Sequence, residues 1–321
     1  MIYLPLEHIE TRYTTHMDRD IVAYLRKKGV SFTYLAPEVL SNEIRHGSFL
    51  DADNTIYRQF HQFNELISLL LAGKVSEDET LWVSDIWDFA LLAVPYLNYF
   101  SGYRLKVRGF LHAGSFTDTD FVRQLERYYK CMEDTLFDIC DEIYVGSNFM
   151  KTDLLKKRYI NPDKVIVTGL PLDYVGLAPY KGKHEKENLV VFNGRNVDEK
   201  QPYLFDLLQK RLPGYKYINT QAQGLSKAEY YDVLSRAKVI VSFALQENFG
   251  FGVQEAVHLG CIPVLPDRLA YVEQFAPEYR YRNFDECVDK VAAAMAGELK
   301  PTSPTYPDND KIFATWFSGL F

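Results

Sequence analysis

Residues 239–266 read VIVSFALQENFGFGVQEAVHLGCIPVLP, and this stretch decides the fold of the chain. An apolar run predicts a buried strand over 239–245, which leads into a glycine-containing loop with the acid Glu247. A helix is expected to open near Gly252 and to carry a second acid, Glu255, before another short buried strand. A glycine-rich turn between a strand and a helix lets backbone N–H groups and the helix N-terminus approach an anion. The stretch therefore predicts a strand–helix–strand unit with an anion site at its turn.

The two carboxylates of this segment need partners other than a bare anion, which they would repel. A carboxylate accepts hydrogen bonds from two hydroxyl groups well. A ligand that joins a phosphate to sugar hydroxyls explains both the anion site and the acids. The sequence therefore predicts a sugar-nucleotide site.

A second motif lies upstream, where NGRNVDEK follows a predicted strand and Arg195 precedes Lys200 by five positions. Together, the two motifs resemble the E-x7-E and G-R-x4-K motifs of the family 4 retaining glycosyltransferases, clearly over residues 142–296. The resemblance implies the two-domain GT-B fold, with Arg195 and Lys200 on the donor diphosphate. It also implies that Glu255 binds the ribose and that Glu247 positions the sugar ring. The complete expected donor set is Arg195, Lys200, Thr220, Gln221, Glu247, Asn248, Phe249, Gly250, Phe251 and Glu255.

One position departs from the family pattern, because Ala244 stands where members often have Ser. The same half of the chain looks like the tRNA-queuosine mannosyltransferases, and the loop with Glu10, Arg12, Tyr13 and Thr14 resembles bacteriophage glycosyltransferases. Both likenesses favour a hydroxylated or modified nucleobase in DNA or tRNA as one candidate acceptor. A glycan, a lipid-linked sugar and a small metabolite are the others. Residues 1–172 carry 19 basic and 24 acidic side chains, a net charge of −5, which disfavours nucleic acid.

The length of 321 residues is enough for two domains of ordinary size. Apolar, β-rich runs alternate with helical patterns in two series, which predicts parallel sheets. With the resemblance, we expect an α/β protein of the GT-B fold, whose two Rossmann-like domains face a central cleft. The expected parts are an acceptor domain at 1–172, a donor domain at 173–305 and a helix at 306–321 that packs back on the first domain. The predicted strands are 2–6, 31–35, 80–84, 106–111, 142–145 and 165–167, then 189–193, 215–219, 239–243, 262–265 and 279–281.

No apolar run reaches the roughly 20 residues needed to span a bilayer, and the N-terminus lacks a basic region followed by an apolar one. The four cysteines show no paired CxxC spacing and lie mostly in apolar segments, as expected of free thiols in a reducing compartment. These features predict a cytoplasmic protein.

Ligands of open parallel sheets bind beyond the carboxyl ends of the strands. Polar or aromatic side chains follow the predicted strands of the first domain at these ends, and we expect them to bind the acceptor. They are Glu7, Arg12, Tyr13, Thr14, Asp85, Trp87 and His112. In the family that the chain resembles, a histidine at a comparable strand end reaches the donor sugar or the reacting centre, so His112 is a catalytic candidate with Arg195, Lys200 and Glu247. A neutral imidazole can accept a hydrogen bond from a sugar hydroxyl without adding charge.

The triplet Asp118-Thr119-Asp120 matches the DxD motif that binds a metal in the other large glycosyltransferase fold. It precedes a helical pattern, however, and Asp and Thr are typical helix-capping residues, so we expect a cap. No histidine has metal-ligand spacing. With Arg195 and Lys200 available to neutralise the leaving diphosphate, we expect no metal and no cofactor besides the nucleoside-diphosphate sugar.

The sequence thus favours a retaining glycosyltransferase that moves a sugar from a nucleoside diphosphate to a hydroxyl acceptor. Two alternatives stay open. A sugar-nucleotide epimerase of the same fold would hydrolyse its donor without any acceptor, and a non-catalytic sensor would bind the donor without turnover.

Overall fold

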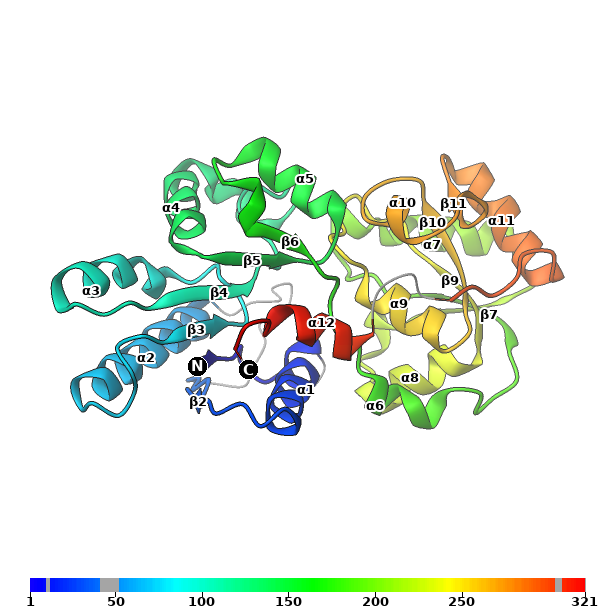
Figure 1. The fold of residues 1–321 in the computed structure, drawn as a ribbon. Coiled ribbons are helices and arrows are strands. Elements are labelled where there is room, and N and C mark those ends of the chain that lie inside the picture. The colour runs from blue at the N-terminus through cyan, green and yellow to red at the C-terminus, as the bar shows by residue number, and fades with distance from the viewer. Residues whose placement is uncertain (10–11, 41–51, 304–307, 321) are drawn as a thin grey trace. The chain divides into compact units, whose positions relative to one another are not determined.

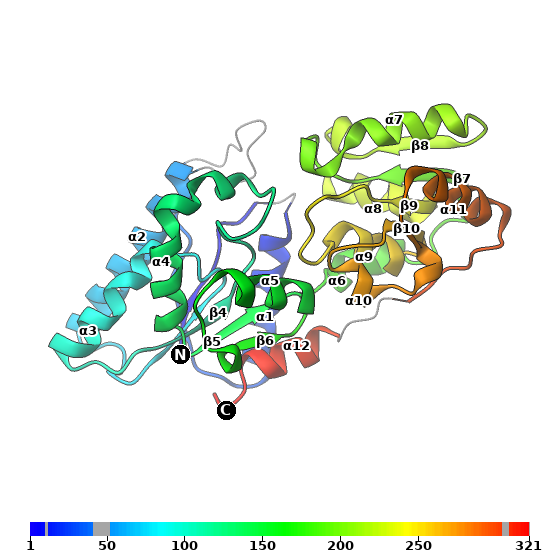
Figure 2. The same ribbon diagram turned by 90° about the horizontal axis from the view of Figure 1, so that it is seen from above.

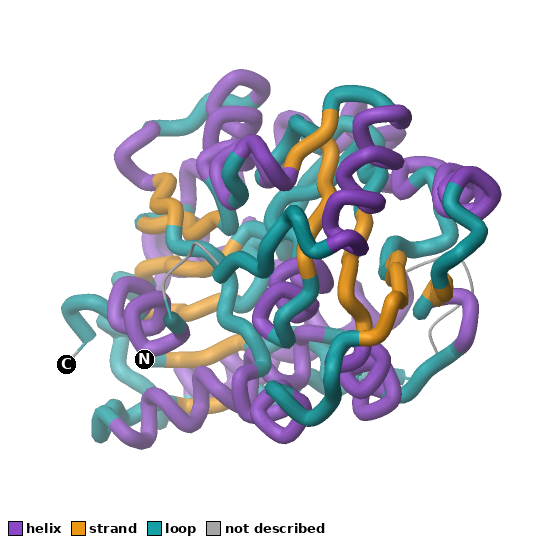
Figure 3. The backbone as a smooth tube through the Cα atoms, turned by 90° about the vertical axis from the view of Figure 1, so that its right-hand side faces the viewer, coloured by secondary structure: helices purple, strands orange, loops and turns teal. Residues whose placement is uncertain are grey.

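The computed structural model of the chain describes residues 1–9, 12–40, 52–303 and 308–320. The chain divides into two compact units, Met1–Leu170 with Asp308–Phe321, and Pro171–Pro307. In each unit a parallel sheet runs between helices (Figures 1 and 3). The α/β class with two Rossmann-like parallel sheets, predicted from the strand rhythm, is confirmed. Glu10 of the predicted acceptor loop lies outside the described residues.

The first unit contains a six-stranded sheet in the order β2-β1-β3-β4-β5-β6, and every neighbouring pair is parallel. Its strands are β1 (Ile2–Leu4), β2 (Thr33–Tyr34), β3 (Thr80–Val83), β4 (Lys106–Phe110), β5 (Glu142–Val145) and β6 (Val165–Val167). Its helices are α1 (Tyr13–Lys27), α2 (Ala52–Leu71), α3 (Val94–Ser101), α4 (Glu126–Ile139), α5 (Asn148–Lys157) and α12 (Asn309–Trp316). Each predicted strand of the first series is present.

Side-chain alternation along the central strands gives the two faces of this sheet different characters. Leu81 and Val83 of β3 enter the aliphatic core that helices α2, α4 and α5 share, whereas Trp82 points to the opposite face. There, α12 lies next to α1 (Figures 1 and 2), and the ring of the fully buried Trp316 stacks on Trp82 at 5.2 Å. The indole N–H of Trp316 donates to Thr168 Oγ1 at 2.9 Å. An apolar C-terminal helix thus completes the cover of the first sheet.

The second unit contains a five-stranded sheet in the order β11-β10-β9-β7-β8, also parallel throughout. Its strands are β7 (Glu187–Phe192), β8 (Lys216–Asn219), β9 (Ala237–Val241), β10 (Ile262–Pro266) and β11 (Arg280–Tyr281). Its helices are α6 (Tyr174–Leu177), α7 (Pro202–Arg211), α8 (Lys227–Arg236), α9 (Phe251–His258), α10 (Tyr271–Gln274) and α11 (Phe284–Ala296). Helices α8 and α9 lie on one face, and α7 and α11 on the other (Figure 1). The second series of predicted strands is therefore also present.

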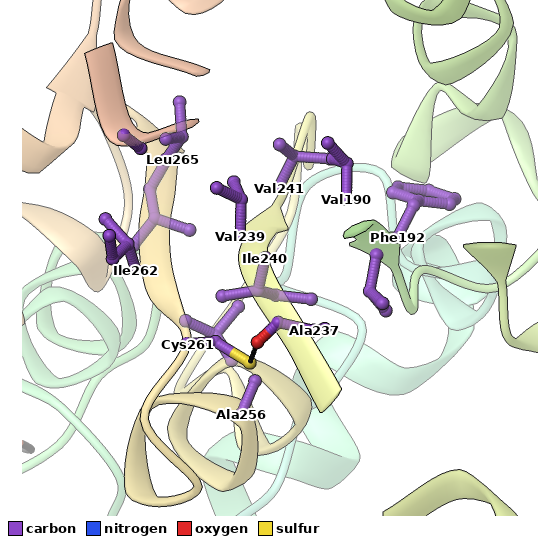
Figure 4. Close-up of a cluster of buried hydrophobic side chains, with 14 of the residues drawn as sticks. Val190, Phe192, Ala237, Val239, Ile240, Val241, Ala256, Cys261, Ile262 and Leu265 are labelled. Carbon is purple, nitrogen blue, oxygen red and sulfur yellow. Dashed lines mark hydrogen bonds between the residues drawn. The ribbon is translucent and has the colours of Figure 1, made fainter. Parts of the chain in front are cut away.

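Strand β9 lies inside the core of the second unit, so its side chains are buried on both faces. Val239, Ile240 and Val241 have no exposed surface, which is why this strand is continuously apolar instead of alternating. Figure 4 shows these side chains among the neighbours that β7, β10 and α9 contribute. The thiol of Cys261 lies in the same core and donates to the Ala237 carbonyl oxygen at 3.2 Å. This core fixes the loop between β9 and α9, which carries the first acid of the E-x7-E motif.

Candidate functional site

The loop between β9 and α9 is closed by Glu247 itself. The backbone N–H of Gly250 donates to Glu247 Oε1 at 2.9 Å, and helix α9 begins at Phe251, near the predicted start. Gly250 has a φ of 84°, in the left-handed region. A Cβ at this position would also lie 3.0 Å from the Tyr271 ring. A glycine is therefore required here, and the turn holds Glu247 at the N-terminus of α9.

The two cations of the G-R-x4-K motif lie in the turn that follows β7, and Lys200 reaches Glu247. The Lys200 ammonium is 3.4 Å from Glu247 Oε2 and 3.7 Å from Glu199 Oε1, and it also donates to the Gln246 carbonyl oxygen. Arg195 pairs with Glu199 at 2.6 Å. Its side chain is 39% exposed, against 12% for Lys200. The structure thus brings both motifs together at one end of the sheet, with Glu199 as a partner that the sequence did not reveal.

The second acid, Glu255, is held by three donors and is only 4% exposed. Its Oε1 accepts from Lys227 Nζ at 2.8 Å and from the Tyr231 hydroxyl at 3.0 Å, and its Oε2 accepts from the Tyr230 hydroxyl at 3.0 Å. Burial and the Glu255 charge hold the pKa of Tyr231 far above its ordinary value, so this hydroxyl keeps its proton. Sequence reasoning missed all three donors, because lysine and tyrosine on a helix give no pattern that points to a site.

A glycine also lets the end of β7 approach the first turn of α9. A Cβ on Gly252 would lie 2.1 Å from Asn193 Nδ2 and 3.1 Å from the Tyr230 hydroxyl. Asn193 Nδ2 donates to that hydroxyl at 3.1 Å, which connects the strand end to the partners of Glu255. This close contact therefore requires a glycine at position 252, whereas Gly250 is required by its left-handed φ.

The other expected donor residues lie around the same strand ends. Thr220 follows β8, where its N–H donates to the Phe192 carbonyl oxygen at 3.0 Å. Its hydroxyl is buried and has no hydrogen-bond partner among the described residues. Gln221 is exposed next to it, and Asn248 accepts from Gln246 Nε2 at 2.7 Å. The Phe249 ring is buried, and its carbonyl oxygen accepts from Gln274 Nε2 at 2.9 Å. Phe249 thus contributes backbone and packing at this turn.

In the first unit, all seven residues expected to bind the acceptor line one pocket. They occupy the carboxyl ends of β1, β3 and β4 and the start of α1. The complete lining is Leu6, Glu7, Arg12, Tyr13, Thr14, Asp85, Trp87, His112, Ala113, Gly114, Asp120 and Val122. Because carboxyl ends of parallel strands meet at one edge, residues far apart in the sequence converge there.

His112 is fixed in one tautomer within this pocket. Its Nε2 lies 2.9 Å from the Ser84 carbonyl oxygen, which can only accept, so Nε2 carries the proton. Its Nδ1 then accepts from the Tyr13 hydroxyl at 3.1 Å. Burial, aided by the nearby Arg12 charge, lowers the pKa of His112 to about 4. The imidazole is therefore neutral at pH 7, and a ligand hydroxyl would compete with Tyr13 for Nδ1.

Two carboxyl groups of the pocket lie in different surroundings. Glu7 pairs with the buried Arg58 at 2.9 Å, a partner on α2 that sequence reasoning missed. Among the described residues, the hydrogen bond of the Asp85 side chain comes from the backbone: Oδ1 accepts from the Trp87 N–H at 3.1 Å. Burial raises the pKa of Asp85 to about 7. This pocket can therefore hold a carboxyl group that changes its protonation state near neutral pH.

The DxD triplet is part of a helix cap, as the sequence predicted. Asp120 Oδ1 accepts from the Val122 N–H at 3.1 Å at the start of a 3-10 turn, η2 (Phe121–Leu125), which precedes α4. Asp118 pairs with Lys157 at 2.8 Å. Within the described ranges, no group of three or more His, Cys, Asp or Glu side chains could hold a metal ion. The described residues also contain no helix that is long and apolar enough to cross a membrane.

Comparison with known proteins defines the class of this fold. No known protein-family profile matches the chain. The chain is similar to the sucrose-phosphate synthase of Thermosynechococcus elongatus, with a TM-score of 0.67 and 11% identity over 100% of this chain and 94% of that one. The starch synthase IV catalytic domain of Arabidopsis thaliana, bound to ADP and acarbose, gives a TM-score of 0.65 and 10% identity over 98% and 93%. These neighbours are GT-B glycosyltransferases, and this chain has the GT-B fold, as the sequence predicted.

A local sequence relative is more specific. The chain is 28% identical over 129 residues to the tRNA-queuosine alpha-mannosyltransferase of Drosophila melanogaster. The aligned part covers 35% of this chain and 33% of that protein, so the chain matches about a third of its relative's length.

Proposed function

We propose that this chain is a glycosyltransferase that moves a sugar from a nucleoside-diphosphate sugar to a hydroxyl acceptor, with retention at the anomeric carbon. The observation that carries this proposal is the meeting of Lys200 and Glu247 at 3.4 Å, where the turn after β7 meets the N-terminus of α9. Two motifs separated in the sequence thereby form one group of cations and carboxylates beside a helix N-terminus. Such a group suits a diphosphate that is attached to a sugar.

The chemistry asked of this group is charge stabilisation. As the bond between the anomeric carbon and the β-phosphate oxygen breaks, negative charge grows on the diphosphate, and an acceptor hydroxyl forms the new bond to that carbon. Arg195 and Lys200 are the cations that would bind the growing charge, together with the α9 N-terminus. Both are balanced by Glu199 and Glu247 before a ligand binds, so the donor exchanges one set of ion pairs for another. These residues supply the neutralisation for which other enzymes use a divalent metal.

The ribose is assigned to the neighbourhood of Glu255. Its carboxylate is already held by Lys227, Tyr230 and Tyr231, so a ribose hydroxyl would share or displace one of these donors. Lys227 is the candidate for displacement that we propose, because its side chain is 22% exposed and can turn to water. Glu255 would then accept from the ribose in its place.

The acceptor is assigned to the pocket of the first unit. A neutral His112, the hydroxyl of Tyr13 and the carboxyl of Asp85 give this pocket acceptors and donors for hydroxyl groups. Trp87 adds an aromatic wall.

A hydroxylated or modified nucleobase in tRNA or DNA is the acceptor class that we place first for testing. Its support is the local similarity to a protein named for tRNA queuosine, together with the aromatic wall, which suits base stacking. Sugars and small metabolites form the second class, since the fold neighbours include sucrose-phosphate and starch synthases.

A thermal-shift screen of UDP-, GDP-, ADP- and dTDP-sugars tests donor binding first. A ligand that binds only the native state stabilises it by about 2.7 kcal/mol at a hundredfold excess over Kd. The stabilising donor is then offered with queuosine-containing tRNA, with DNA that contains 5-hydroxymethylcytosine and with monosaccharides, in the presence of EDTA. Transfer of the sugar by the wild type, with a kcat/KM that falls roughly 10- to 150-fold in Arg195→Ala, supports the proposal. The control Lys216→Ala removes an exposed cation of the same unit and should transfer normally.

Other outcomes contradict the proposal. Donor hydrolysis with release of an epimer and no transfer indicates the epimerase, and donor binding without any turnover indicates the sensor. A lack of stabilisation by every nucleotide sugar would remove the donor site itself.

A further inference from the structure

The pocket of the first unit is backed by a fully buried acid, Glu133, from the middle of α4. This carboxylate accepts four hydrogen bonds. Two reach Oε1, from the Ser115 N–H at 2.6 Å and from the Trp87 indole N–H at 2.8 Å. Two reach Oε2, from the Ser115 hydroxyl at 2.9 Å and from Arg158 Nε at 2.8 Å. Every strong acceptor position of this buried carboxylate is therefore occupied.

Arg158, just beyond the end of α5, is the counter-charge of Glu133. Its side chain has no exposed surface. Its guanidinium also donates to Glu126 Oε1 at 3.1 Å, to the Ser115 hydroxyl at 3.0 Å and to the Lys157 carbonyl oxygen at 2.9 Å. Glu133 and Arg158 thus form a completely paired, buried ion pair.

The groups that Glu133 holds are two separate walls of the pocket. Trp87 belongs to the loop after β3, and Gly114 and Ser115 belong to the loop after β4 that also carries His112. The packing at the second loop is tight, because a Cβ on Gly114 would lie 2.6 Å from the Phe116 ring and 2.9 Å from Glu133 Oε1. One carboxylate therefore sets the orientation of the indole on one side and of the glycine turn on the other.

Stability alone gives little reason for such a pair. Removing two charges from water costs about as much as their attraction returns, and apolar replacements are often neutral or stabilising. A charged acceptor in a fixed place does, however, orient the donors around it more strictly than apolar contacts would.

We infer that Glu133 is a positioning residue of the acceptor pocket, with Arg158 as its counter-charge, and that it sets the affinity of the protein for its acceptor by fixing Trp87 and the Gly114 turn. This inference rests on the proposed function insofar as it concerns the acceptor. Glu133 does not line the pocket, so its effect passes through the residues that it holds.

The variant Glu133→Gln tests the inference in the full-length chain. The amide keeps the shape but has one acceptor oxygen, which the charged Arg158 attracts, so its NH2 group then faces the N–H groups of Trp87 and Ser115. The double variant Glu133→Gln/Arg158→Met removes that attraction and lets the amide oxygen turn back to the two walls. The control Asp138→Asn removes the charge of an acid on the same helix whose side chain is 92% exposed.

Two measurements are made on each variant. The first is the indole 15N–1H signal of Trp87, assigned with Trp87→Phe. The chain has three tryptophans, and the other two serve as internal references because neither indole N–H donates to Glu133. The Trp316 indole donates to a hydroxyl, and the Trp82 indole has no partner among the described residues. The second is the KM for the acceptor that the wild type glycosylates in the panel above, with the KM for donor hydrolysis alongside.

In Glu133→Gln we expect the Trp87 signal to move while those of Trp82 and Trp316 stay, and the acceptor KM to rise about tenfold with an unchanged donor KM. Both values should return toward wild type in the double variant and stay unchanged in Asp138→Asn. An unmoved Trp87 signal with an unchanged acceptor KM overturns the inference. So does a loss of acceptor and donor turnover in the same proportion, since it would indicate a purely structural pair. If the wild type transfers no sugar at all, the proposed function fails, and the Trp87 signal alone decides on the positioning role.

Discussion

Replacement of Glu255 by Gln tests the proposed donor site most sharply, because the carboxylate is nearly buried and its partners are known. The amide keeps the shape of the side chain and removes its charge. Lys227 loses its counter-charge, and one oxygen remains for Tyr230 and Tyr231. Tyr231 can turn to Asp173 Oδ2, which lies 3.2 Å from its hydroxyl. The substitution therefore changes the group that would accept from the ribose and leaves the packing of α9 as it is.

The size of the effect follows from these contacts. A hydrogen bond to a charged group contributes about 1.5–3 kcal/mol, so losing the ribose contact should weaken nucleoside-diphosphate binding by roughly 10- to 150-fold. The loss of a tyrosine hydrogen bond to the charged carboxylate should also lower the free energy of unfolding by about 1–3 kcal/mol, toward the lower value where Tyr231 turns to Asp173. Lys227 adds less to this loss, because its partly exposed ammonium can turn to water.

The matched variant is Glu247→Gln. Lys200 keeps Glu199 and the Gln246 carbonyl oxygen as partners when the Glu247 charge is removed. The amide oxygen can therefore stay on the Gly250 N–H, and the loop stays closed. A bare nucleoside diphosphate has no sugar ring for Glu247 to hold, and its affinity should change little. Turnover with the complete donor should fall instead, because contacts that tighten in the transition state appear in kcat.

Calorimetry with the bare nucleoside diphosphate compares both variants at a temperature well below their melting points. Glu185→Gln, an exposed acid of the same unit, is the control and should bind like the wild type. Equal losses of affinity in the Glu247 and Glu255 variants would refute the division of the two acids between sugar and ribose. Unchanged affinity in both would remove the E-x7-E acids from the nucleotide site altogether.

Four further predictions follow from the structure. Arg195→Ala and Lys200→Ala should each lower kcat/KM by an amount equivalent to ~1.5–3 kcal/mol, because each removes a charged contact to the phosphates. Lys200→Ala should also lower the melting temperature, because it leaves the carboxylates of Glu199 and Glu247 without the cation between them, and equal stability of the two variants would contradict this. Trp316→Ala should lower the free energy of unfolding by about 3–5 kcal/mol in urea titration, since the ring is fully buried on Trp82; a loss below 1 kcal/mol would show that α12 does not stabilise the sheet. Burial raises the folded-state pKa of Asp85 to about 7, so the stability that its proton contributes is fully present below the unfolded-state pKa and is lost as pH rises through 7. The free energy of unfolding of Asp85→Asn should therefore rise relative to that of the wild type between pH 4 and 7, and parallel curves of this free energy against pH would contradict the raised pKa. Asp120→Ala should cost about 1 kcal/mol of stability through the lost cap, and activity should survive EDTA; full loss in EDTA with recovery in manganese would make the triplet a metal site.

The positions of the strands along the chain and their parallel type could be predicted from the sequence, because the local pattern of apolar residues decides them. An apolar, β-branched run such as 239–241 is soluble only when both of its faces are covered, which requires a central parallel strand. The start of α9 was equally local, since the left-handed Gly250 ends the loop and opens the helix.

The convergence of the seven proposed acceptor residues on one pocket could also be predicted from the sequence, for a topological reason. All strands of a parallel sheet point the same way, so a residue that follows any of them lies at the same edge. Asp85 follows β3, His112 follows β4 and Glu7 follows β1, and they share a pocket because these strands end at the same edge of the sheet. The cap role of Asp120 followed from its place before a helix.

The partners of these residues were decided by the tertiary structure. Tyr230 and Lys227 reach Glu255 from another helix, Arg58 reaches Glu7 from α2, and Glu133 reaches Trp87 from α4. On their own helices, such charged and hydroxyl side chains look like a solvated surface, because hydrogen bonds carry no periodic pattern along the chain. Which of them is buried depends on how each helix rotates and settles on its sheet, and that is determined only when both sides of the core are packed.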